Sequence, residues 1–296
     1  MRSNNSERLL FFLHIPKAAG STLSQIIRRQ YDASEVLDSY PATFRHKFAA
    51  QDARESARLR YRYFDKLASQ SKDRARAFMG HEGFGFHQAL ARPTTYITLL
   101  RDPVDRVISH YYYIRRDKHN RMHKMVSQPE MSLAEFVTSG ISNEVDNGQT
   151  KFLAGLNTPY LKAGEYGPEI LDAARHNLAT HFKIVGLMER FDETLILMKR
   201  HLGWRWPFYV RANVTQKRPH RRDIAPDTIA LIQEANTLDL ELYQFASERF
   251  VANLQAQDPS FHQELKTFQQ LNKLYALWHK AITAARRQIR SLRPIL

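Results

Sequence analysis

The sequence predicts a three-layer α/β fold in which helices flank a central, mainly parallel sheet. Short apolar runs that suit buried strands alternate with longer stretches of helical periodicity. Alternating strands and helices are joined by right-handed crossovers, which produce a parallel sheet. At 296 residues the chain is long enough for one large domain, which we expect over residues 1–253, followed by a helical extension over residues 254–296.

The predicted elements follow one another in a regular order. A buried strand is expected at residues 9–14 and a helix at residues 21–30, with Ser21 or Thr22 in its first turn. Further strands are expected at residues 77–79, 94–100 and 182–187, and helices at residues 102–116 and 191–202. Ligands of such folds gather at the carboxyl ends of the strands. The residues that we expect along this edge are His14, Lys17, Gly80, His81, Arg101 and Asp102.

A basic insertion and a long final helix extend this core. The insertion covers about residues 38–76, and between Arg45 and Arg76 it holds ten lysines and arginines against four acidic residues. A solvated helix face is the ordinary explanation of such a run. From residue 259 onward, apolar residues recur in steps of three and four, a heptad pattern that predicts docking onto the body or a partner helix in a homo-oligomer. The residues of this pattern are Phe268, Leu271, Tyr275, Trp278, Ile282, Ala285, Ile289 and Leu292.

Composition limits the classes of partner. The chain has 44 lysines and arginines against 30 acidic residues, a net charge of +14, which favours an anionic ligand such as a polyphosphate cofactor, an acidic polymer, nucleic acid or an anionic membrane. The absence of cysteine excludes disulfides and thiolate metal sites. The longest apolar runs are far shorter than the roughly 20 residues of a membrane helix, and we see no signal peptide. We therefore expect a cytoplasmic protein without a transmembrane segment.

The stretch HIPKAAGSTL, residues 14–23, joins the first strand to the first helix. Nucleotide triphosphatases place the lysine after the last glycine of this loop, whereas Lys17 precedes Gly20 here. Backbone amides at the helix N-terminus can still surround an anion, and a lysine from the strand side could reach a bridging oxygen rather than a terminal phosphate. A structural loop with an exposed lysine is the alternative. The candidate anion-binding residues are Lys17, Ala18, Ala19, Gly20, Ser21 and Thr22.

A second stretch, LLRDPVDRVISHYYY at residues 99–113, marks the end of the third strand. Arg101 closes the strand, and Ser109 lies about two turns into the following helix. The two could meet one phosphate only if the strand turns tightly into the helix, which Pro103 permits. Taken alone, the pair Arg101 and Asp102 is more often a structural ion pair.

Together the two stretches resemble the sulfotransferases that use 3′-phosphoadenosine 5′-phosphosulfate (PAPS). The closer resemblance is to the carbohydrate branch that includes heparan sulfate and uronosyl 2-O-sulfotransferases. It is carried by FMGHEGFG (78–85), DNGQTKFLAG (146–155) and the segments at 185–202 and 238–250, so that it spans residues 9 to about 250. The resemblance implies a P-loop-like fold and sulfuryl transfer from PAPS, without a metal, to a carbohydrate hydroxyl, with adenosine 3′,5′-bisphosphate as the second product.

The resemblance also assigns roles to residues. It implies that the loop at Lys17 binds the 5′-phosphosulfate and that Arg101 and Ser109 hold the 3′-phosphate. It places the catalytic histidine at His81, which would act as general base, with the adjacent Glu82 as the rival base. Some relatives carry a second histidine where this chain has Met79. The segment NVTQKRP, residues 213–219, resembles a loop that closes over the cofactor, through Lys217 and Arg218.

Two alternatives remain from the residues alone. A P-loop kinase or nucleotide hydrolase would use the same strand, loop and helix and recruit Asp102 for magnesium, but the required order of glycine, lysine and hydroxyl is missing. A non-enzymatic binder of polyanions would use the basic insertion and the tail. We expect the enzyme, with a saccharide acceptor and no nucleic-acid partner, and the basic insertion favours an acidic saccharide.

Overall fold

The computed structural model describes residues 8–40, 74–90, 92–211 and 219–291, together with residues 55, 59 and 62. Most of the basic insertion predicted at residues 38–76 therefore lies outside the described residues. Lys217 and Arg218 also lie outside them.

A five-stranded parallel sheet forms the centre of the molecule, in the order β2-β3-β1-β4-β5. Its strands are β1 (Leu9–Leu13), β2 (Val36–Asp38), β3 (Ala77–Gly80), β4 (Thr94–Leu100) and β5 (Phe182–Leu187). The predicted α/β class and parallel sheet are confirmed, and β4 and β5 have the predicted bounds. The edge strand β2 was not predicted, because three half-buried residues show no periodicity of their own and become a strand only by pairing with β3.

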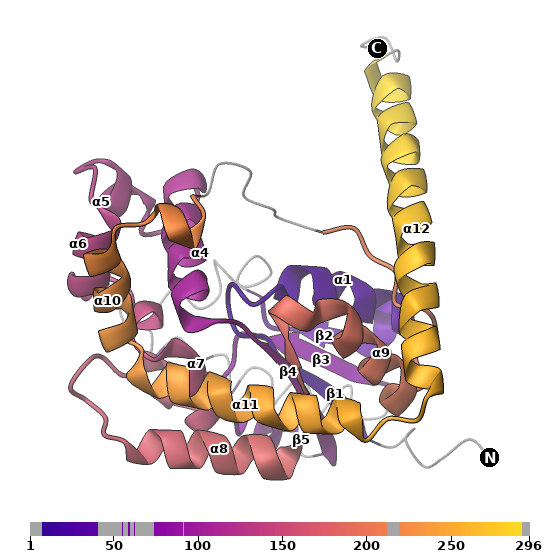
Figure 1. Cartoon of the computed structure of the whole chain (residues 1–296), viewed down its shortest axis with the longest axis horizontal. Helices are drawn as coiled ribbons and strands as arrows, with labels where there is room; N and C mark the ends of the chain where they lie inside the picture. The colour runs from indigo at the N-terminus through magenta and orange to yellow at the C-terminus, as the bar shows by residue number, and fades with distance from the viewer. Residues whose placement is uncertain are drawn as a thin grey trace.

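Helices cover the sheet on both sides (Figure 1). They are α1 (Gly20–Gln30), α4 (Pro103–Arg116), α5 (His123–Ser127), α6 (Leu133–Thr138), α7 (Gly148–Ala154), α8 (Glu169–His181), α9 (Phe191–Leu202), α10 (Pro226–Glu234), α11 (Thr237–Gln255) and α12 (Ser260–Ser291). In Figure 1, α1 lies above the sheet and α8 below it, while α11 runs beside the edge strand β5. Among the described helices, none combines the length and the apolar composition that crossing a membrane requires.

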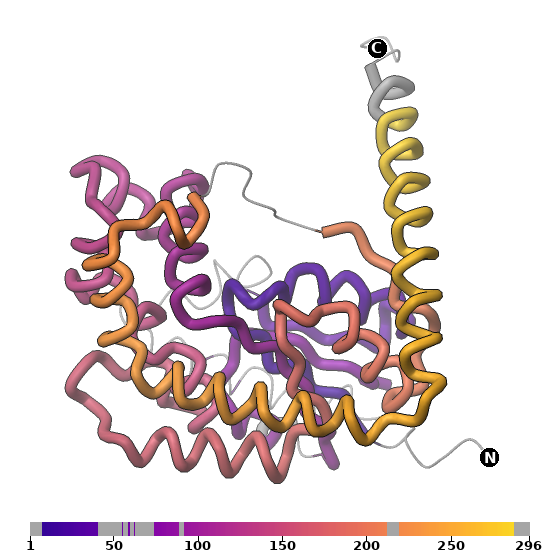
Figure 2. The backbone as a smooth tube through the Cα atoms, viewed as in Figure 1, coloured from indigo at the N-terminus to yellow at the C-terminus, as the bar shows by residue number. Residues whose placement is uncertain are grey.

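The apolar core has two parts. The larger part fills the space around the sheet, where Phe11, Phe12 and Phe78 have no exposed surface. The smaller part joins α4, α5, α6 and α10 around residues such as Val107 and Phe136, and it forms a helical lobe at the carboxyl ends of the strands. The backbone tube in Figure 2 passes from this lobe through α11 and along the sheet to α12. The position of α4 is therefore set by a core of its own.

The final helix begins at Ser260, close to the predicted start at residue 259. Phe261 and Phe268 are buried against the body. Beyond this docked part, α12 extends away from the rest of the molecule (Figure 1). Docking, one of the two predicted uses of the heptad pattern, thus applies to the beginning of the helix.

A buried polar network fixes the segment of residues 146–155. The Asp239 carboxylate accepts hydrogen bonds from the amides of Gln149 and Thr150, at 3.0 and 2.7 Å, and from the Thr150 hydroxyl at 2.8 Å. The Arg106 guanidinium lies 3.9 Å from the same carboxylate, and both side chains are fully buried. A buried charge that loses its partner is strongly destabilising. This network therefore anchors both α7 and α4 to α11.

We expect the substitution Asp239→Asn to lower the free energy of unfolding by about 3 kcal/mol, because it removes the fully buried one of the two carboxylates beside the buried Arg106. Denaturant unfolding of the full chain measures this difference. The exposed residue Asp227, in the first turn of α10, provides the control: Asp227→Asn should cost less than about 1 kcal/mol. Equal losses for the two variants would contradict a structural role for the Asp239 network.

Candidate functional site

The carboxyl ends of β1, β3 and β4 meet at one edge, as predicted from the sequence. Leu13 pairs with Gly80 of β3 and with Thr98 of β4. The His14 amide donates to the Gly80 carbonyl at 2.8 Å, and the Thr98 hydroxyl donates to the Leu13 carbonyl at 2.9 Å. The loop that leaves β1 is thus held between two neighbouring strands.

The loop from His14 to Ala19 has an unusual backbone. Lys17 and Ala19 have φ values of 69° and 59°, in the left-handed region that residues with a side chain rarely adopt. Such conformations cost about 1 kcal/mol each and cluster at functional sites. Gly20 begins α1, and a Cβ atom there would lie 1.9 Å from the His14 imidazole. Only glycine therefore allows the histidine ring to pack against the start of the helix.

Arg101 joins this loop to the end of β4. Its guanidinium donates from Nη1 to the Lys17 carbonyl oxygen at 3.1 Å, and Nη2 lies 3.9 Å from the Asp105 carboxylate. The side-chain amide of Gln149 accepts from the Arg101 amide at 3.0 Å and donates to the Arg101 carbonyl at 2.9 Å. The two stretches that the sequence singled out are therefore in direct contact, and Gln149 holds the backbone at their junction.

Lys17 carries a partly buried positive charge at the centre of this arrangement. Its ammonium lies 3.8 Å from the centre of the Tyr113 ring, in a cation–π contact with α4. Burial lowers the pKa of Lys17 to about 8, and the charges of Arg116 and Arg101 act in the same direction. An anion bound next to this lysine would offset that unfavourable environment. The site is thus suited to a negatively charged ligand.

His81 lies beside the loop with a defined protonation pattern. Its Nδ1 atom is 2.7 Å from the carbonyl oxygen of His14, which can only accept, so that Nδ1 carries the proton. In the neutral ring the lone pair is then on Nε2, the atom that a general base uses. The side chain is half-buried, whereas the neighbouring Glu82 is only 2% exposed.

A second imidazole accompanies His81, although not from the position considered in the sequence. Met79 is buried in the core, and it is His14 whose ring centre lies 4.2 Å from that of His81. The Nδ1 atom of His14 is 2.8 Å from the hydroxyl of Tyr40, which is itself 2.6 Å from the Ser24 hydroxyl. Burial, together with the charges of His81 and Lys17, lowers the pKa of His14 well below its usual value. His14 is therefore neutral and positions its neighbour.

Glu144 is the carboxylate of the site that the sequence did not reveal. It lies in a short 3₁₀ helix, Asn143–Val145, with its Oε2 atom 3.7 Å from Arg106 and 3.9 Å from His110. Burial opposes its ionisation, but electrostatic interactions with neighbouring groups, led by His110 and Arg106, hold the pKa of Glu144 below its usual value. Its charge in turn raises the pKa of Lys17. No motif marks Glu144, because only the folded chain brings it to this place.

His110 sits behind Glu144 and is not a candidate base. Its Nε2 atom is 3.0 Å from the Ser142 hydroxyl, and burial lowers the pKa of His110 to about 4 despite the nearby carboxylate of Glu144. The ring is therefore neutral at physiological pH. It contributes to the packing of α4 against the segment that carries Glu144.

The other residues predicted for the site lie in the loop before α1, in the first turn of α1 and in or next to α4. Ser21 is exposed, Thr22 is buried in the first turn of α1, and Ala18 is buried in the core. Ser109 is half-buried in α4, two turns beyond Arg101. Asp102 caps α4 by accepting from the Asp105 amide at 2.9 Å. Within the described ranges, no cluster of three or more histidine or acidic side chains could hold a metal ion.

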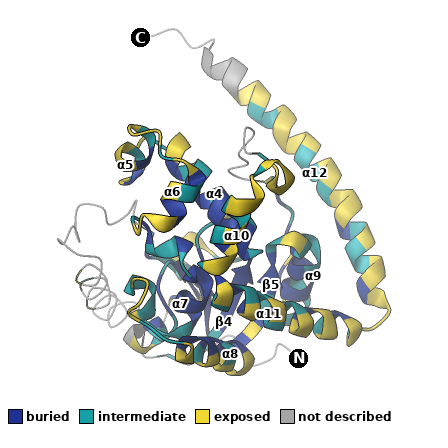
Figure 3. Ribbon diagram, turned by 60° about the vertical axis from the view of Figure 1, so that its left-hand side comes forward, coloured by how far each residue is buried: buried dark blue, intermediate teal, exposed yellow. Residues whose placement is uncertain are grey.

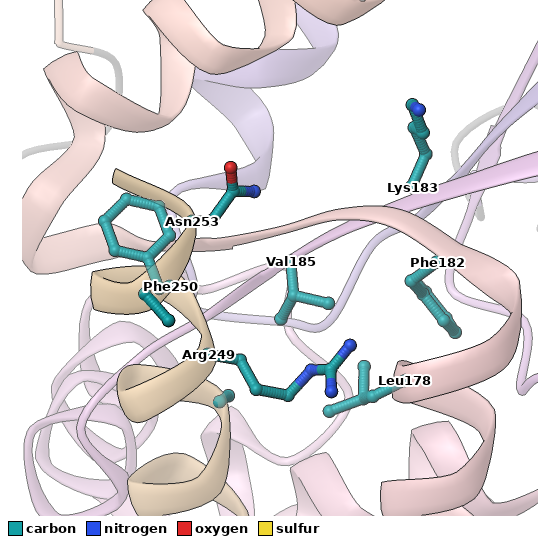
Figure 4. A pocket seen from close by; sticks show the side chains of 9 residues that line it. Leu178, Phe182, Lys183, Val185, Arg249, Phe250 and Asn253 are labelled. Atoms are coloured by element: carbon teal, nitrogen blue, oxygen red, sulfur yellow. The ribbon is translucent and has the colours of Figure 1, made fainter. Parts of the chain in front are cut away.

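A pocket elsewhere on the molecule is separate from this edge. Its lining comes mainly from α11 and the beginning of β5, and includes Phe182, Val185, Arg249 and Phe250 (Figure 4). It lies beside the amino-terminal half of β5, whereas Lys17, His81 and Arg101 lie at the carboxyl ends of their strands. The candidate site is therefore the loop edge and not this pocket.

Comparison with known proteins gives consistent matches. The family model described as galactose-3-O-sulfotransferase matches residues 2–276. Heparan sulfate 2-O-sulfotransferase 1 of Homo sapiens is 25% identical over 168 residues, which cover 52% of this chain and 47% of that protein. Uronyl 2-sulfotransferase of Homo sapiens is 23% identical over 199 residues, which cover 58% of this chain and 46% of that protein. The chain spans about half the length of these curated relatives.

Among solved structures, the crystal structure of mouse sulfotransferase SULT7A1 complexed with PAP superposes with a TM-score of 0.38 at 11% sequence identity. The superposition covers 95% of this chain and 89% of that chain.

The lowered pKa of Lys17 predicts how anion binding depends on pH. The ammonium is present below a pH of about 8 and is lost above it, so that the affinity for adenosine 3′,5′-bisphosphate should fall about fivefold between pH 8 and pH 9. Lys17→Arg should remove this fall, because arginine stays charged. Calorimetric titrations from pH 6 to pH 9.5 measure both dependences. A wild-type affinity that is constant up to pH 9.5 would contradict the assignment.

Replacement of Glu144 tests the electrostatic coupling separately. Glu144→Gln removes the charge that raises the pKa of Lys17, so the same loss of affinity should begin at a lower pH than in the wild type. Glu234→Gln, an exposed change on α10, is the control and should leave the pH dependence unchanged. If the two variants have identical profiles, Glu144 does not act on Lys17.

Proposed function

Because this chain belongs to the galactose-3-O-sulfotransferase family, we propose that it transfers the sulfuryl group of PAPS to a hydroxyl of a galactose-containing saccharide. The observation that carries the proposal is the contact between the Arg101 guanidinium and the carbonyl of Lys17. It brings two residues with cationic side chains together at the carboxyl edge of a parallel sheet, where such folds bind their ligands. The family match over residues 2–276 argues against the kinase and polyanion-binding alternatives.

The donor set fits a nucleotide with two separate phosphate groups. PAPS supplies the sulfuryl group when bound. We assign the 5′-phosphosulfate to Lys17 and the loop amides from Ala18 to Thr22, and the 3′-phosphate to Arg101 and Ser109. The assignment to Lys17 is supported by the charge of its ammonium, which would stabilise the negative charge that develops on the bridging oxygen. The assignment of the 3′-phosphate to Arg101 is supported by the guanidinium, whose paired N–H donors match the geometry of a phosphate group.

We assign the role of general base to His81. A carbohydrate hydroxyl must lose its proton as it attacks, and Nε2 of His81 carries the lone pair when Nδ1 donates to the His14 carbonyl. The hydrogen bond also fixes the plane of the ring. His14 contacts this ring from the loop side, so that the position of the base depends on the same loop that holds Lys17.

We expect His81→Asn to reduce turnover at least about 100-fold while the affinity for adenosine 3′,5′-bisphosphate changes only a few-fold. The asparagine amide can still donate to the His14 carbonyl, so the variant removes the base and keeps the hydrogen bond. His176→Asn, an exposed change on α8, is the matched control. Transfer of labelled sulfate from PAPS measures turnover, and calorimetry measures affinity. Near-normal turnover of His81→Asn together with an inactive Glu82→Gln would assign the base to Glu82.

The acceptor is tested with labelled PAPS and three classes of saccharide. We expect transfer to galactose-terminated oligosaccharides and none to glucose-terminated ones of the same length. A uronic-acid polysaccharide such as desulfated heparan sulfate is the third class, chosen because the matched relatives are named for that chemistry. If sulfate is transferred only to the polysaccharide, the acceptor is a uronic-acid polysaccharide and the proposed galactose acceptor is wrong. Absence of transfer to all three classes, by a protein that binds adenosine 3′,5′-bisphosphate, would contradict a carbohydrate acceptor.

A further inference from the structure

The long helix α12 changes character along its length. Its first turns are docked, with Phe268 fully buried, and Tyr275 accepts a hydrogen bond from Arg29 of α1 at 2.7 Å. Around this contact, large apolar side chains face outward: Leu274, Leu277 and Trp278 are 62%, 64% and 60% exposed. Figure 3 shows the outer part of α12 largely exposed and separate from the body. The surface of a soluble protein rarely exposes three large apolar side chains within one and a half turns of a helix.

These side chains form one continuous stripe. At 100° per residue, the apolar residues of this part of the helix fall within an arc of about 140°. We define the apolar stripe of α12 as Leu271, Leu274, Leu277, Trp278 and Ile282. Lys273 and Lys280 flank this stripe, about 40° and 60° beyond Leu277 around the helix, and both are exposed. The outer part of α12 is therefore amphipathic, with a broad apolar face and a basic face.

The charge of this region identifies the kind of partner. From Leu265 to the end of the sequence there are seven lysines and arginines and no acidic residue. A second copy of the helix would place like charges side by side, because the positions flanking the heptad seam offer no acidic partner. The stripe is also wider than a two-helix seam, since Leu274 and Leu277 lie beside it. A soluble polyanion, such as nucleic acid or an acidic polysaccharide, would bind the basic residues but would leave the leucines and Trp278 exposed to water.

We propose that the outer part of α12 binds in the plane of an anionic lipid bilayer. A helix with a broad apolar face and basic residues on its polar side lies at the boundary of headgroups and acyl chains, and anionic lipids add electrostatic attraction. Tryptophan is enriched at that boundary, which suits the exposed Trp278. The docked turns around Phe268 tie the helix to α9, so binding would bring the catalytic body to the membrane surface.

Flotation of the full chain with lipid vesicles tests this proposal. We expect binding to vesicles of phosphatidylcholine with a quarter phosphatidylglycerol, at least tenfold weaker binding to phosphatidylcholine alone, and weaker binding in high salt. The triple variant Leu274→Ser, Leu277→Ser, Trp278→Ser should lose at least tenfold in affinity for the anionic vesicles. The double variant Gln270→Ser, His279→Ser changes exposed polar residues of the same helix and should bind as the wild type does. Circular dichroism confirms that each variant is folded.

Two results would overturn the proposal. One is equal binding of the triple variant and the wild type to anionic vesicles. The other is a dimer in light scattering that persists with vesicles present and that the triple variant abolishes, which would assign the apolar stripe to a second copy of the chain. A blue shift of tryptophan emission on addition of anionic vesicles, absent in Trp278→Phe, would place this side chain at the lipid and support the proposal.

Discussion

The hydrogen bond from the Arg101 guanidinium to the Lys17 carbonyl oxygen is the contact on which the candidate site depends. It crosses from the end of β4 to the loop after β1, two neighbouring strands whose carboxyl ends meet at the same edge. Because the loop holds Lys17 and Ala19 in left-handed conformations, it needs external support to keep its shape. Arg101 provides that support and brings a second positive charge to the same place.

The surrounding polar residues hold this contact in position. Gln149 pairs with both backbone groups of Arg101, and the Asp239 carboxylate holds the amide of Gln149 in turn. Buried polar groups of this kind are stable only when each has its partners. Through Gln149, the segment at residues 146–155 therefore links α11 to the end of β4.

The sequence predicted those parts of the fold that have strong local signals. The strands β4 and β5 and the helix α9 have the predicted bounds, because each is a continuous apolar or amphipathic run with clear ends. Strand β2 was not predicted, because its three residues form a strand by pairing with β3 and have no hydrophobic periodicity in the sequence. The approach of His14 to His81 and the placement of Glu144 could not be predicted, since both arise only when separate segments pack together. The sequence motifs therefore predicted that the site lies at the carboxyl ends of the strands. The charged and titratable groups that surround Lys17 and His81 became known only from the folded chain.

The central claim is that Lys17 and Arg101 hold different phosphates of one nucleotide. The most direct test is calorimetric binding of adenosine 3′,5′-bisphosphate and adenosine 5′-phosphate to the wild type and to Arg101→Met. A charge-assisted contact to the 3′-phosphate predicts that the wild type prefers the bisphosphate by about 10- to 100-fold, and that Arg101→Met abolishes this preference. The variant also loses the bond to the Lys17 carbonyl, so the affinity for adenosine 5′-phosphate should fall as well, but by less than the affinity for the bisphosphate. Equal wild-type affinity for the two nucleotides, or an equal loss for both in Arg101→Met, would contradict the claim.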